Sequence, residues 1–121
     1  MVLVDTSVWV AHFKGSNDTL IDLLNTDEVC CHPLRIAELT CGTPPEPRSK
    51  TLKDLSLLRT VTIATMREVL AFIEERALYG KGCGYIDIAL LASALLSNST
   101  KLWTLDKRLS KLAEELNIKY L

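Results

Sequence analysis

The sequence has no excess of either charge and no long apolar run. Among its 121 residues, 14 Lys and Arg stand against 15 Asp and Glu, which gives a formal net charge of -1. No global basic field therefore indicates nucleic-acid binding, and a polyanionic substrate would have to be held by a local basic patch or by a metal ion. The longest uncharged apolar run, IALLASALL, is too short to span a bilayer, so we expect no membrane helix.

Paired cysteine motifs are also missing. None of the four cysteines forms a C-x-x-C spacing, and Cys30 and Cys31 are adjacent within an apolar run. A free cysteine in such a run behaves as a small buried hydrophobe, which argues against a zinc site or a disulfide and suits a reducing cytosol. The N-terminal MVLVDTSVW has no basic flank and carries an acid at position 5, unlike a signal peptide. We therefore expect a cytoplasmic protein.

Internal repeats and low-complexity tracts are absent, and the length suits a single domain over residues 1–121. Short apolar runs alternate with segments of helical periodicity, which predicts an α/β/α sandwich around a central parallel sheet of four to five strands. The expected strands are residues 2–5, 28–32, 61–63 and 101–104, with residues 118–121 as an added edge strand. The expected helices begin near residue 7 and cover residues 18–26, 33–41, 50–60, 65–80, 84–96 and 106–116.

Several residues mark where these elements begin and end. Pro33 suits the first turn of a helix, and Thr65 with Glu68 matches a capping box. The segment GTPPEPRS (42–49) predicts a loop inside the domain, and GKGCG (80–84) predicts a tight loop before the helix GYIDIALLASALL.

Four acidic residues are the candidate functional residues. In parallel α/β sheets, ligands bind outside the carboxyl ends of the strands. Asp5 ends the first expected strand, and Asp106 follows the strand at 101–104. Glu38 lies in the helix after the second strand, and Asp87 lies in the first turn of a strongly apolar helix. We expect these side chains to meet at one edge of the sheet.

Asp87 is the most informative of the four, because it is the only charged residue in GYIDIALLASALL. An ionised carboxylate in such a setting must find a partner, bind a cation or take up a proton. Helical spacing places Leu90, Leu91 and Ala94 on the same face as Asp87. That face should point inward, which would aim Asp87 at the top of the core.

Each acid also has a purely structural explanation. Asp5 and Asp106 could cap the helices that follow them. Glu38 could pair with Arg35, three residues earlier on the same helix. Asp87 could favour its helix dipole, but that contribution is about 0.3–1 kcal/mol, whereas burying a carboxylate costs several kcal/mol. The structural explanation is therefore weakest for Asp87.

Converging carboxylates repel one another unless a cation lies between them. Oxygen ligands with no histidine or thiolate nearby favour Mg²⁺ or Mn²⁺ over zinc. Such an ion can activate a water for in-line attack on a phosphodiester and can stabilise the leaving oxygen. The four acids therefore favour a metal-dependent phosphodiesterase.

The segments VDTSVWVAHF, HPLRIAELTCG, GKGCGYIDIALLASALL and LWTLDKRL occur in this order. Together they resemble the PIN-domain family, in particular the VapC-type toxins of bacterial type II toxin–antitoxin pairs, from residue 2 to about residue 116. The resemblance implies an endoribonuclease that depends on Mg²⁺ or Mn²⁺ and inhibits translation or growth. It also implies inhibition by a cognate antitoxin protein and, often, a homodimer.

The resemblance assigns a role to each acid. It implies that Asp5 and Asp87 are the main metal ligands and that Glu38 is a ligand or a water-orienting base. Asp106 would be an outer ligand or a ligand of a second metal. The family pattern also has hydroxyl residues at the positions of Ser7 and Thr104.

Basic residues near these acids are the candidate contacts to substrate phosphates: Arg35, Lys81, Lys107 and Arg108. A solvated surface position explains each of them equally well. Trp9 and Trp103 could stack on bases, but tryptophans next to buried strands favour a place in the core. His12 and His32 are interpreted as structural.

Two other classes of protein remain open on these residues. A phosphoryl-accepting receiver module also carries acids and Mg²⁺ at strand ends, but it usually needs an acidic pair where this chain has Asp5 followed by Thr6 and Ser7. A non-catalytic module could use the acids to hold a stabilising metal. The helices over residues 18–26, 50–60 and 65–79 carry aliphatic surface that suits a dimer or an antitoxin groove.

Overall fold

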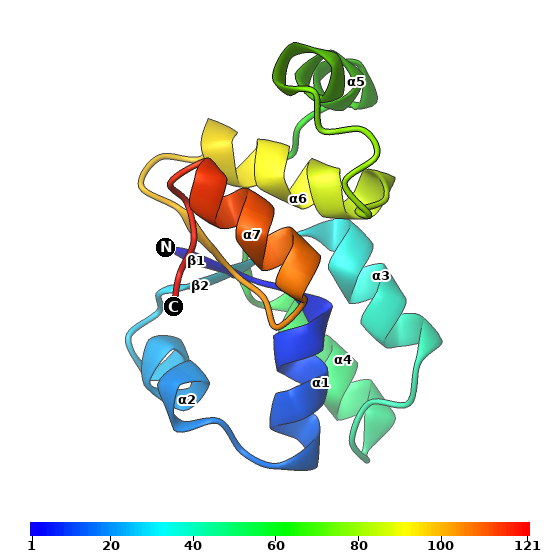
Figure 1. Ribbon diagram of the computed structural model, residues 1–121. Helices are drawn as coiled ribbons and strands as arrows, with labels where there is room; N and C mark the ends of the chain where they lie inside the picture. The colour runs from blue at the N-terminus through cyan, green and yellow to red at the C-terminus, as the bar shows by residue number, and fades with distance from the viewer.

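The computed structural model describes residues 1–121 and contains a four-stranded parallel sheet between two layers of helices (Figure 1). The strands are β1 (Val2–Val4), β2 (Val29–Cys31), β3 (Arg59–Thr60) and β4 (Lys101–Trp103), in the spatial order β3-β2-β1-β4. The helices are α1 (Thr6–Lys14), α2 (Asp18–Asn25), α3 (Pro33–Cys41), α4 (Arg48–Ser56), α5 (Met66–Arg76), α6 (Tyr85–Leu96) and α7 (Lys107–Glu115). The predicted α/β/α class with a parallel sheet is confirmed.

Alternating side chains of β1 explain why helices cover both faces of the sheet. Leu3 is buried among residues of α5, α6 and α7, whereas Val2 and Val4 are buried among residues of α1 to α4. A strand that is apolar on both sides can be buried only in this way. The two helical layers are visible above and below the strands in Figure 1.

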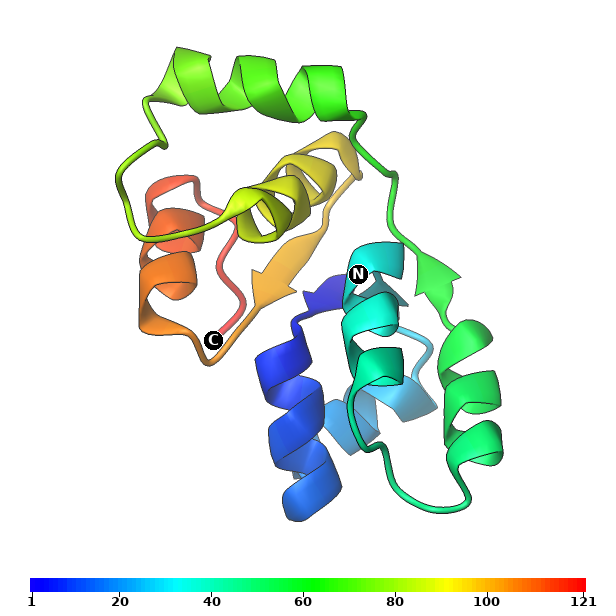
Figure 2. The same cartoon turned by 90° about the vertical axis from the view of Figure 1, so that its right-hand side faces the viewer.

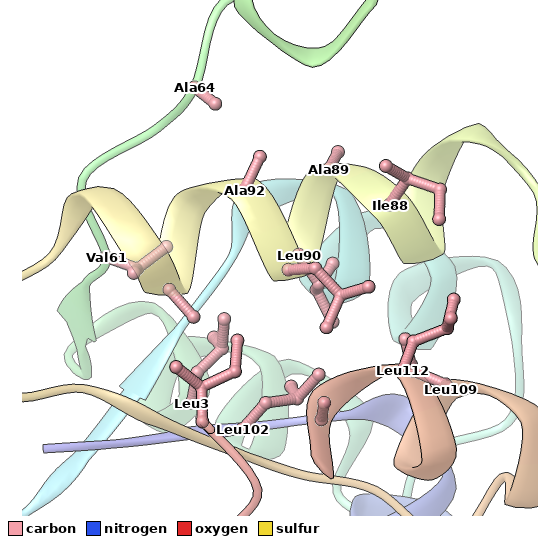
Figure 3. Packing of buried hydrophobic residues seen from close by; sticks show 14 of the residues in the cluster. Leu3, Val61, Ala64, Ile88, Ala89, Leu90, Ala92, Leu102, Leu109 and Leu112 are labelled. Atoms are coloured by element: carbon pink, nitrogen blue, oxygen red, sulfur yellow. The ribbon is translucent and has the colours of Figure 1, made fainter. Parts of the chain in front are cut away.

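Helix α6 is apolar on all sides because it lies between the sheet and α5. Figure 3 shows Leu90 pointing toward Leu3 and Leu102 of the sheet, while Ala89 and Ala92 point to the opposite side. The small alanines allow α5 to approach closely over α6. The inward face predicted for this helix is confirmed, since its residues from Ile88 to Ala94 are all buried.

The third strand is not where the sequence pattern placed it. We expected a strand at residues 61–63 and a helix over 50–60, but α4 ends at Ser56 and β3 is Arg59–Thr60. The exposed β3 pairs in parallel with Cys30 and Cys31 of β2. Val61 is apolar because it packs into the core, not because it belongs to a strand. The apolar character of Val61 therefore indicated burial and not a strand. The polar residues of the edge strand β3 gave no pattern that predicts a strand.

Smaller differences occur at other boundaries. Helix α4 begins at Arg48, inside the expected loop, and α5 ends at Arg76, earlier than the expected 80. Residues 118–121 form only one parallel bridge, between Leu102 and Lys119. The capping box is confirmed: the Thr65 hydroxyl accepts from the Glu68 amide at 3.1 Å, and a Glu68 carboxylate oxygen accepts from the Thr65 amide at 2.9 Å.

The core interpretations also hold. Trp9 and Trp103 are both buried in the cluster beneath α1 to α4, and Cys30 and Cys31 are buried free thiols. Burial raises the pKa of the Cys30 thiol to about 11, so this thiol is not reactive at neutral pH. No helix is both long enough and apolar enough to cross a membrane.

The carboxyl ends of β1 and β4 lie side by side, since the two strands are parallel neighbours (Figure 2). Asp5 directly follows β1, and the loop after β4 contains Thr104 and leads into α7. The fold therefore brings together chain segments that are about one hundred residues apart.

Candidate active site

Three of the four predicted acids meet at the guanidinium group of Arg35. Arg35 Nε lies 2.7 Å from Asp5 Oδ1, and Nη1 lies 2.6 Å from Glu38 Oε1. Nη2 donates to Asp87 Oδ1. Each nitrogen of the guanidinium thus contacts a different carboxylate, and the carboxylates come from the end of β1, from α3 and from α6.

The cluster is buried at one end and open at the other. Asp5 is 4% exposed and Arg35 is 7% exposed. The side chain of Asp87 is 25% exposed and that of Glu38 is 38% exposed. The interpretation of Arg35 as a solvated surface residue is therefore wrong. Its proposed contact to a substrate phosphate stays a prediction.

Arg35 keeps its positive charge in this setting. Burial alone lowers the pKa of the Arg35 guanidinium, but the charge of Asp5 and the hydrogen bonds to Glu38 and Asp87 raise it above its ordinary value. Three carboxylates and one guanidinium leave the cluster with a formal net charge of -2. Such a site attracts cations and repels phosphates.

The second oxygen of Asp5 is held by two hydroxyl groups. Ser7 Oγ and Thr104 Oγ1 each donate to Asp5 Oδ2 at 2.8 Å. Ser7 Oγ accepts from the Leu105 amide at 2.9 Å, and Thr104 Oγ1 accepts from the Asp106 amide at 3.1 Å. Each hydroxyl oxygen already accepts a hydrogen bond from a backbone amide. The single proton of each hydroxyl is therefore free to point to Asp5. This network fixes the orientation of Asp5 and turns Oδ1 toward Arg35.

The structural explanation for Asp5 does not hold, because its carboxylate makes no capping bond to α1. The explanation for Glu38 is partly right, since the pair with Arg35 does form. It is incomplete because the same arginine also contacts two acids from other elements.

Asp106 lies outside the cluster around Arg35. Its Oδ1 accepts from the amides of Arg108 at 2.9 Å and Leu109 at 3.1 Å, so it caps α7. The capping explanation is therefore confirmed for Asp106. Its connection to Asp5 runs through the backbone amide and the hydroxyl of Thr104.

The glycine loop before α6 carries Asp87 into the site. Asp87 Oδ2 accepts from the Gly84 amide at 3.4 Å, which fixes the first turn of the helix. Gly82 has a φ of +83°, and a Cβ there would lie 2.7 Å from Arg108 Cδ. The positive φ favours glycine at this position, whereas the contact is with the flexible end of the Arg108 side chain. The side chain of Arg108 therefore packs across the loop.

The remaining predicted phosphate contacts are at the surface. Lys81, Lys107 and Arg108 are exposed, and none of them forms an ion pair. Cys83, in the same loop, has a raised pKa because of burial and the negative charges of Asp87 and Asp106. The loop therefore lies in the negative field of these two acids.

A cleft of about 580 Å³ adjoins the exposed end of the cluster. It includes Glu38 of α3, Val10, Phe13 and Lys14 of α1, and Pro44 of the loop after α3. Lys14 lines the same cleft as Glu38 and was not among the predicted site residues. The sequence around Lys14 does not indicate this position. The cleft forms only when the loop over residues 42–45 lies next to α1 in the folded protein.

His32 is structural, as interpreted from the sequence. It is buried, and its Nδ1 accepts from the Leu34 amide at 3.1 Å, which caps α3. Burial and the positive charge of Arg35 lower its pKa, so the imidazole is neutral. His12 accepts from the Asn17 amide through Nδ1 at 3.0 Å and likewise fixes a turn.

The donor chemistry of the cluster suits Mg²⁺ or Mn²⁺, because Asp5, Glu38 and Asp87 offer only carboxylate oxygens. Asp5 Oδ1 is buried and makes no hydrogen bond, although it lies 2.7 Å from Arg35 Nε. It therefore keeps lone pairs for a further ligand. In the present arrangement, however, no three His, Cys, Asp or Glu side chains converge closely enough to hold a metal ion. The guanidinium sets the spacing of the carboxylates.

Comparison with known proteins agrees with this architecture. The sequence profile of the PIN domain matches residues 2–115. Ribonuclease VapC32 of Mycobacterium tuberculosis (strain CDC 1551 / Oshkosh) is 41% identical over 118 residues, which cover 98% of this chain and 94% of the relative. The same protein of strain ATCC 25618 / H37Rv matches to the same extent. The fold, the acids at the carboxyl edge of the sheet and these similarities show that the chain belongs to the PIN-domain family.

Proposed function

We propose that this protein is a VapC-type endoribonuclease that depends on Mg²⁺ or Mn²⁺ and acts as the toxin of a toxin–antitoxin pair. The cluster of Asp5, Glu38 and Asp87, with its net charge of -2 at the carboxyl edge of the sheet, is the observation that carries the proposal. The 41% identity to a ribonuclease over nearly the whole chain supports it. Cleavage of cellular RNA would inhibit translation or growth.

The proposed metal ligands are Asp5 and Asp87, with Glu38 as a third ligand or as the base that orients the attacking water. When bound, the ion would polarise the phosphodiester and lower the pKa of a water molecule. Asp106 would be an outer ligand or a ligand of a second ion. Its Oδ1 caps the first turn of α7, so this role would fall to Oδ2, which makes no hydrogen bond within the protein.

The side chains of the protein would divide the remaining tasks. Ser7 and Thr104 keep Asp5 oriented, since both donate to its Oδ2. Glu38 lies at the open end of the cluster, and its Oε2 makes no hydrogen bond or ion pair within the protein. This oxygen is therefore available to accept a proton from a water or to position it.

RNA would be held by basic side chains around the acids. Lys81, Lys107 and Arg108 are exposed and unpaired near the glycine loop and α7, and Lys14 borders the cleft next to Glu38. Their positive charges would offset the repulsion between the phosphates and the acidic cluster. Because the chain has a net charge of -1, RNA binding would depend on local charges of this kind.

The proposed protein partners are a cognate antitoxin and a second copy of the chain. Large apolar side chains are exposed on and beside α5 and at the end of α6: Ile63, Met66, Leu70, Leu95 and Leu96. In α2, Leu20 and Leu23 are buried and Ile21 and Leu24 are half-buried, so this helix offers less apolar surface than α5. We assign the dimer to the exposed surface of α5. A monomer in light scattering at micromolar concentration would contradict this part of the proposal.

The test of the proposed activity is cleavage of total bacterial RNA by the purified protein. We expect discrete fragments with Mn²⁺ and no fragments with EDTA. Asp87→Asn and Asp5→Asn should each abolish cleavage while circular dichroism shows that the protein stays folded. Asp54→Asn is the matched control, because Asp54 is an exposed aspartate paired only with Lys50.

Full activity of both site variants would contradict the proposal. Equal digestion by wild type and Asp87→Asn would show a contaminating nuclease. Cleavage of DNA alone would mean that the substrate is DNA and not RNA.

The two other classes of protein have less support. A receiver module does not agree with the PIN-domain match. A purely stabilising metal has less support, because Arg35 already pairs with Asp5 and Asp87 in the structure.

A further inference from the structure

The guanidinium of Arg35 contacts one oxygen of each of the three proposed metal ligands. Asp5 Oδ1, Glu38 Oε1 and Asp87 Oδ1 all face Arg35. The other oxygens of the two aspartates are bound elsewhere, Asp5 Oδ2 by two hydroxyls and Asp87 Oδ2 by the Gly84 amide. A divalent ion that used the three inward oxygens would therefore compete with Arg35 for them.

A metal ion bound by all three of these oxygens would have to enter the space between them, which the guanidinium fills. Arg35 nitrogens lie 2.7 Å from Asp5 Oδ1 and 2.6 Å from Glu38 Oε1. A bound Mg²⁺ lies about 2.0–2.1 Å from its oxygen ligands and demands near-octahedral geometry. The oxygens would have to move inward to the space that the guanidinium fills.

We propose that Arg35 is an internal competitor of the divalent metal: its guanidinium occupies the acidic cluster in the metal-free protein and must leave before the metal binds. The inference rests on the proposed function, since it uses the same three carboxylates as metal ligands. It adds that Arg35 raises the metal concentration needed for the ion to bind to the acidic cluster.

The geometry makes the displacement feasible. Glu38 and Asp87 are partly exposed, so the cluster is open on their side. Arg35 Nε lies 2.7 Å from Asp5 Oδ1 without making a hydrogen bond, so this contact is ionic and less directional than the other two. A divalent ion brings twice the charge of the guanidinium that it would displace, so it offsets more of the negative charge of the three carboxylates.

The first test measures metal affinity by isothermal titration of Mn²⁺ into the metal-free protein. Arg35→Gln keeps a polar side chain but removes the competing charge, so we expect the metal to bind about tenfold to hundredfold more tightly than in wild type. Arg35→Lys should give an intermediate gain, because one ammonium group cannot contact three carboxylates at once. Arg59→Gln is the matched control and should leave the affinity unchanged.

The second test follows Arg35 itself by the NMR signal of its Nε–H group during titration of wild type with Mg²⁺. We expect the Arg35 signal to shift in step with metal binding while the Arg59 signal stays constant. This measurement needs no substitution, so it remains informative where Arg35→Gln fails to fold in EDTA. Arg35→Lys then carries the affinity measurement.

Unchanged or weaker metal binding in both Arg35 variants would overturn the inference and leave the proposed nuclease intact. An Arg35 signal that does not respond to saturating Mg²⁺ would overturn it as well. Failure of all proteins to bind Mn²⁺ would overturn the proposed metal site together with the inference. Loss of binding in Asp87→Asn, with tighter binding in Arg35→Gln, would support both.

Discussion

Arg35 and Arg59 each pair with an aspartate from a distant part of the chain, but their settings differ. The side chain of Arg35 is 8% exposed, whereas Arg59 and its partner Asp27 are 64% and 68% exposed. Arg59 Nη2 lies 2.5 Å from Asp27 Oδ2, a distance similar to those in the Arg35 cluster. Distance alone therefore does not distinguish the two sites.

Burial and the number of partners do distinguish them. Water screens the Arg59–Asp27 pair, which connects β3 to the turn before β2. In the Arg35 cluster, three carboxylates share one cation in a largely buried place, so each charge depends on the others. A buried cluster whose charges do not cancel lowers the stability of the fold, and the same excess negative charge favours the binding of a cation.

The largest effect is expected from removing the cation of the buried cluster. Arg35→Gln in EDTA should lower the free energy of unfolding by about 3–5 kcal/mol, because it leaves buried carboxylates without a partner. Urea denaturation followed by circular dichroism measures this change. A loss below about 1 kcal/mol would mean that the carboxylates find protons or water instead and that the comparison with Arg59 fails.

A smaller effect is expected at Asp106, which sharpens the comparison because this acid lies outside the cluster. Asp106→Ala should lower the free energy of unfolding by about 0.5–2 kcal/mol through loss of the cap of α7. Asp106→Asn keeps an oxygen that can cap and should retain most of the stability. If Asp106→Asn nevertheless cleaves RNA more slowly, the charge of Asp106 acts on the metal and not on the helix.

A pH effect is expected at His32, whose pKa is lowered below its ordinary value of 6.5 by burial and by Arg35. The folded protein holds this imidazole neutral, and the unfolded chain takes up a proton more readily. The stabilising contribution is therefore complete above pH 6.5 and is lost as the pH falls through the lowered folded pKa. Melting temperatures between about pH 7 and pH 5.5 should fall less steeply for His32→Asn, which can still cap α3. Parallel profiles would contradict this assignment.

The smallest effect is expected from the exposed pair. Arg59→Gln should leave the urea midpoint within experimental error, because solvent and salt already screen both charges. The pKa of Asp27, which is lowered by its hydrogen bond to Arg59 and by the charge of that arginine, should return toward its ordinary value. NMR titration of Asp27 would show this change. Destabilisation comparable to that of Arg35→Gln would remove the distinction between the two sites.

Much of the site was predictable because it follows local rules. Asp5 at the end of an apolar strand and Asp87 in the first turn of an apolar helix are visible in the sequence, and the structure brings both to one cluster. Asp106 shows the limit of such reasoning. Its position after β4 fits a ligand and a helix cap equally well, and only the folded structure shows that it caps α7.

The role of Arg35 was not predictable from its neighbourhood. Spacing suggested a pair with Glu38 or a contact to a phosphate, and the pair with Glu38 exists. The contact with Asp87 joins residues 52 positions apart, so no local pattern reports it. The edge strand β3 was missed for a similar reason, since exposed Arg59 and Thr60 are defined as a strand only by their pairing with β2.

The sequence by itself determined the parallel α/β class, the buried α6 and the need to compensate the charge of Asp87. These follow from periodicity and from the cost of burying a carboxylate, which depend on residue type and spacing alone. Only the tertiary structure decided which cation compensates that charge. Ionic contacts act over a few ångströms, and the folding of β1, α3 and α6 onto one sheet edge sets which charges come that close.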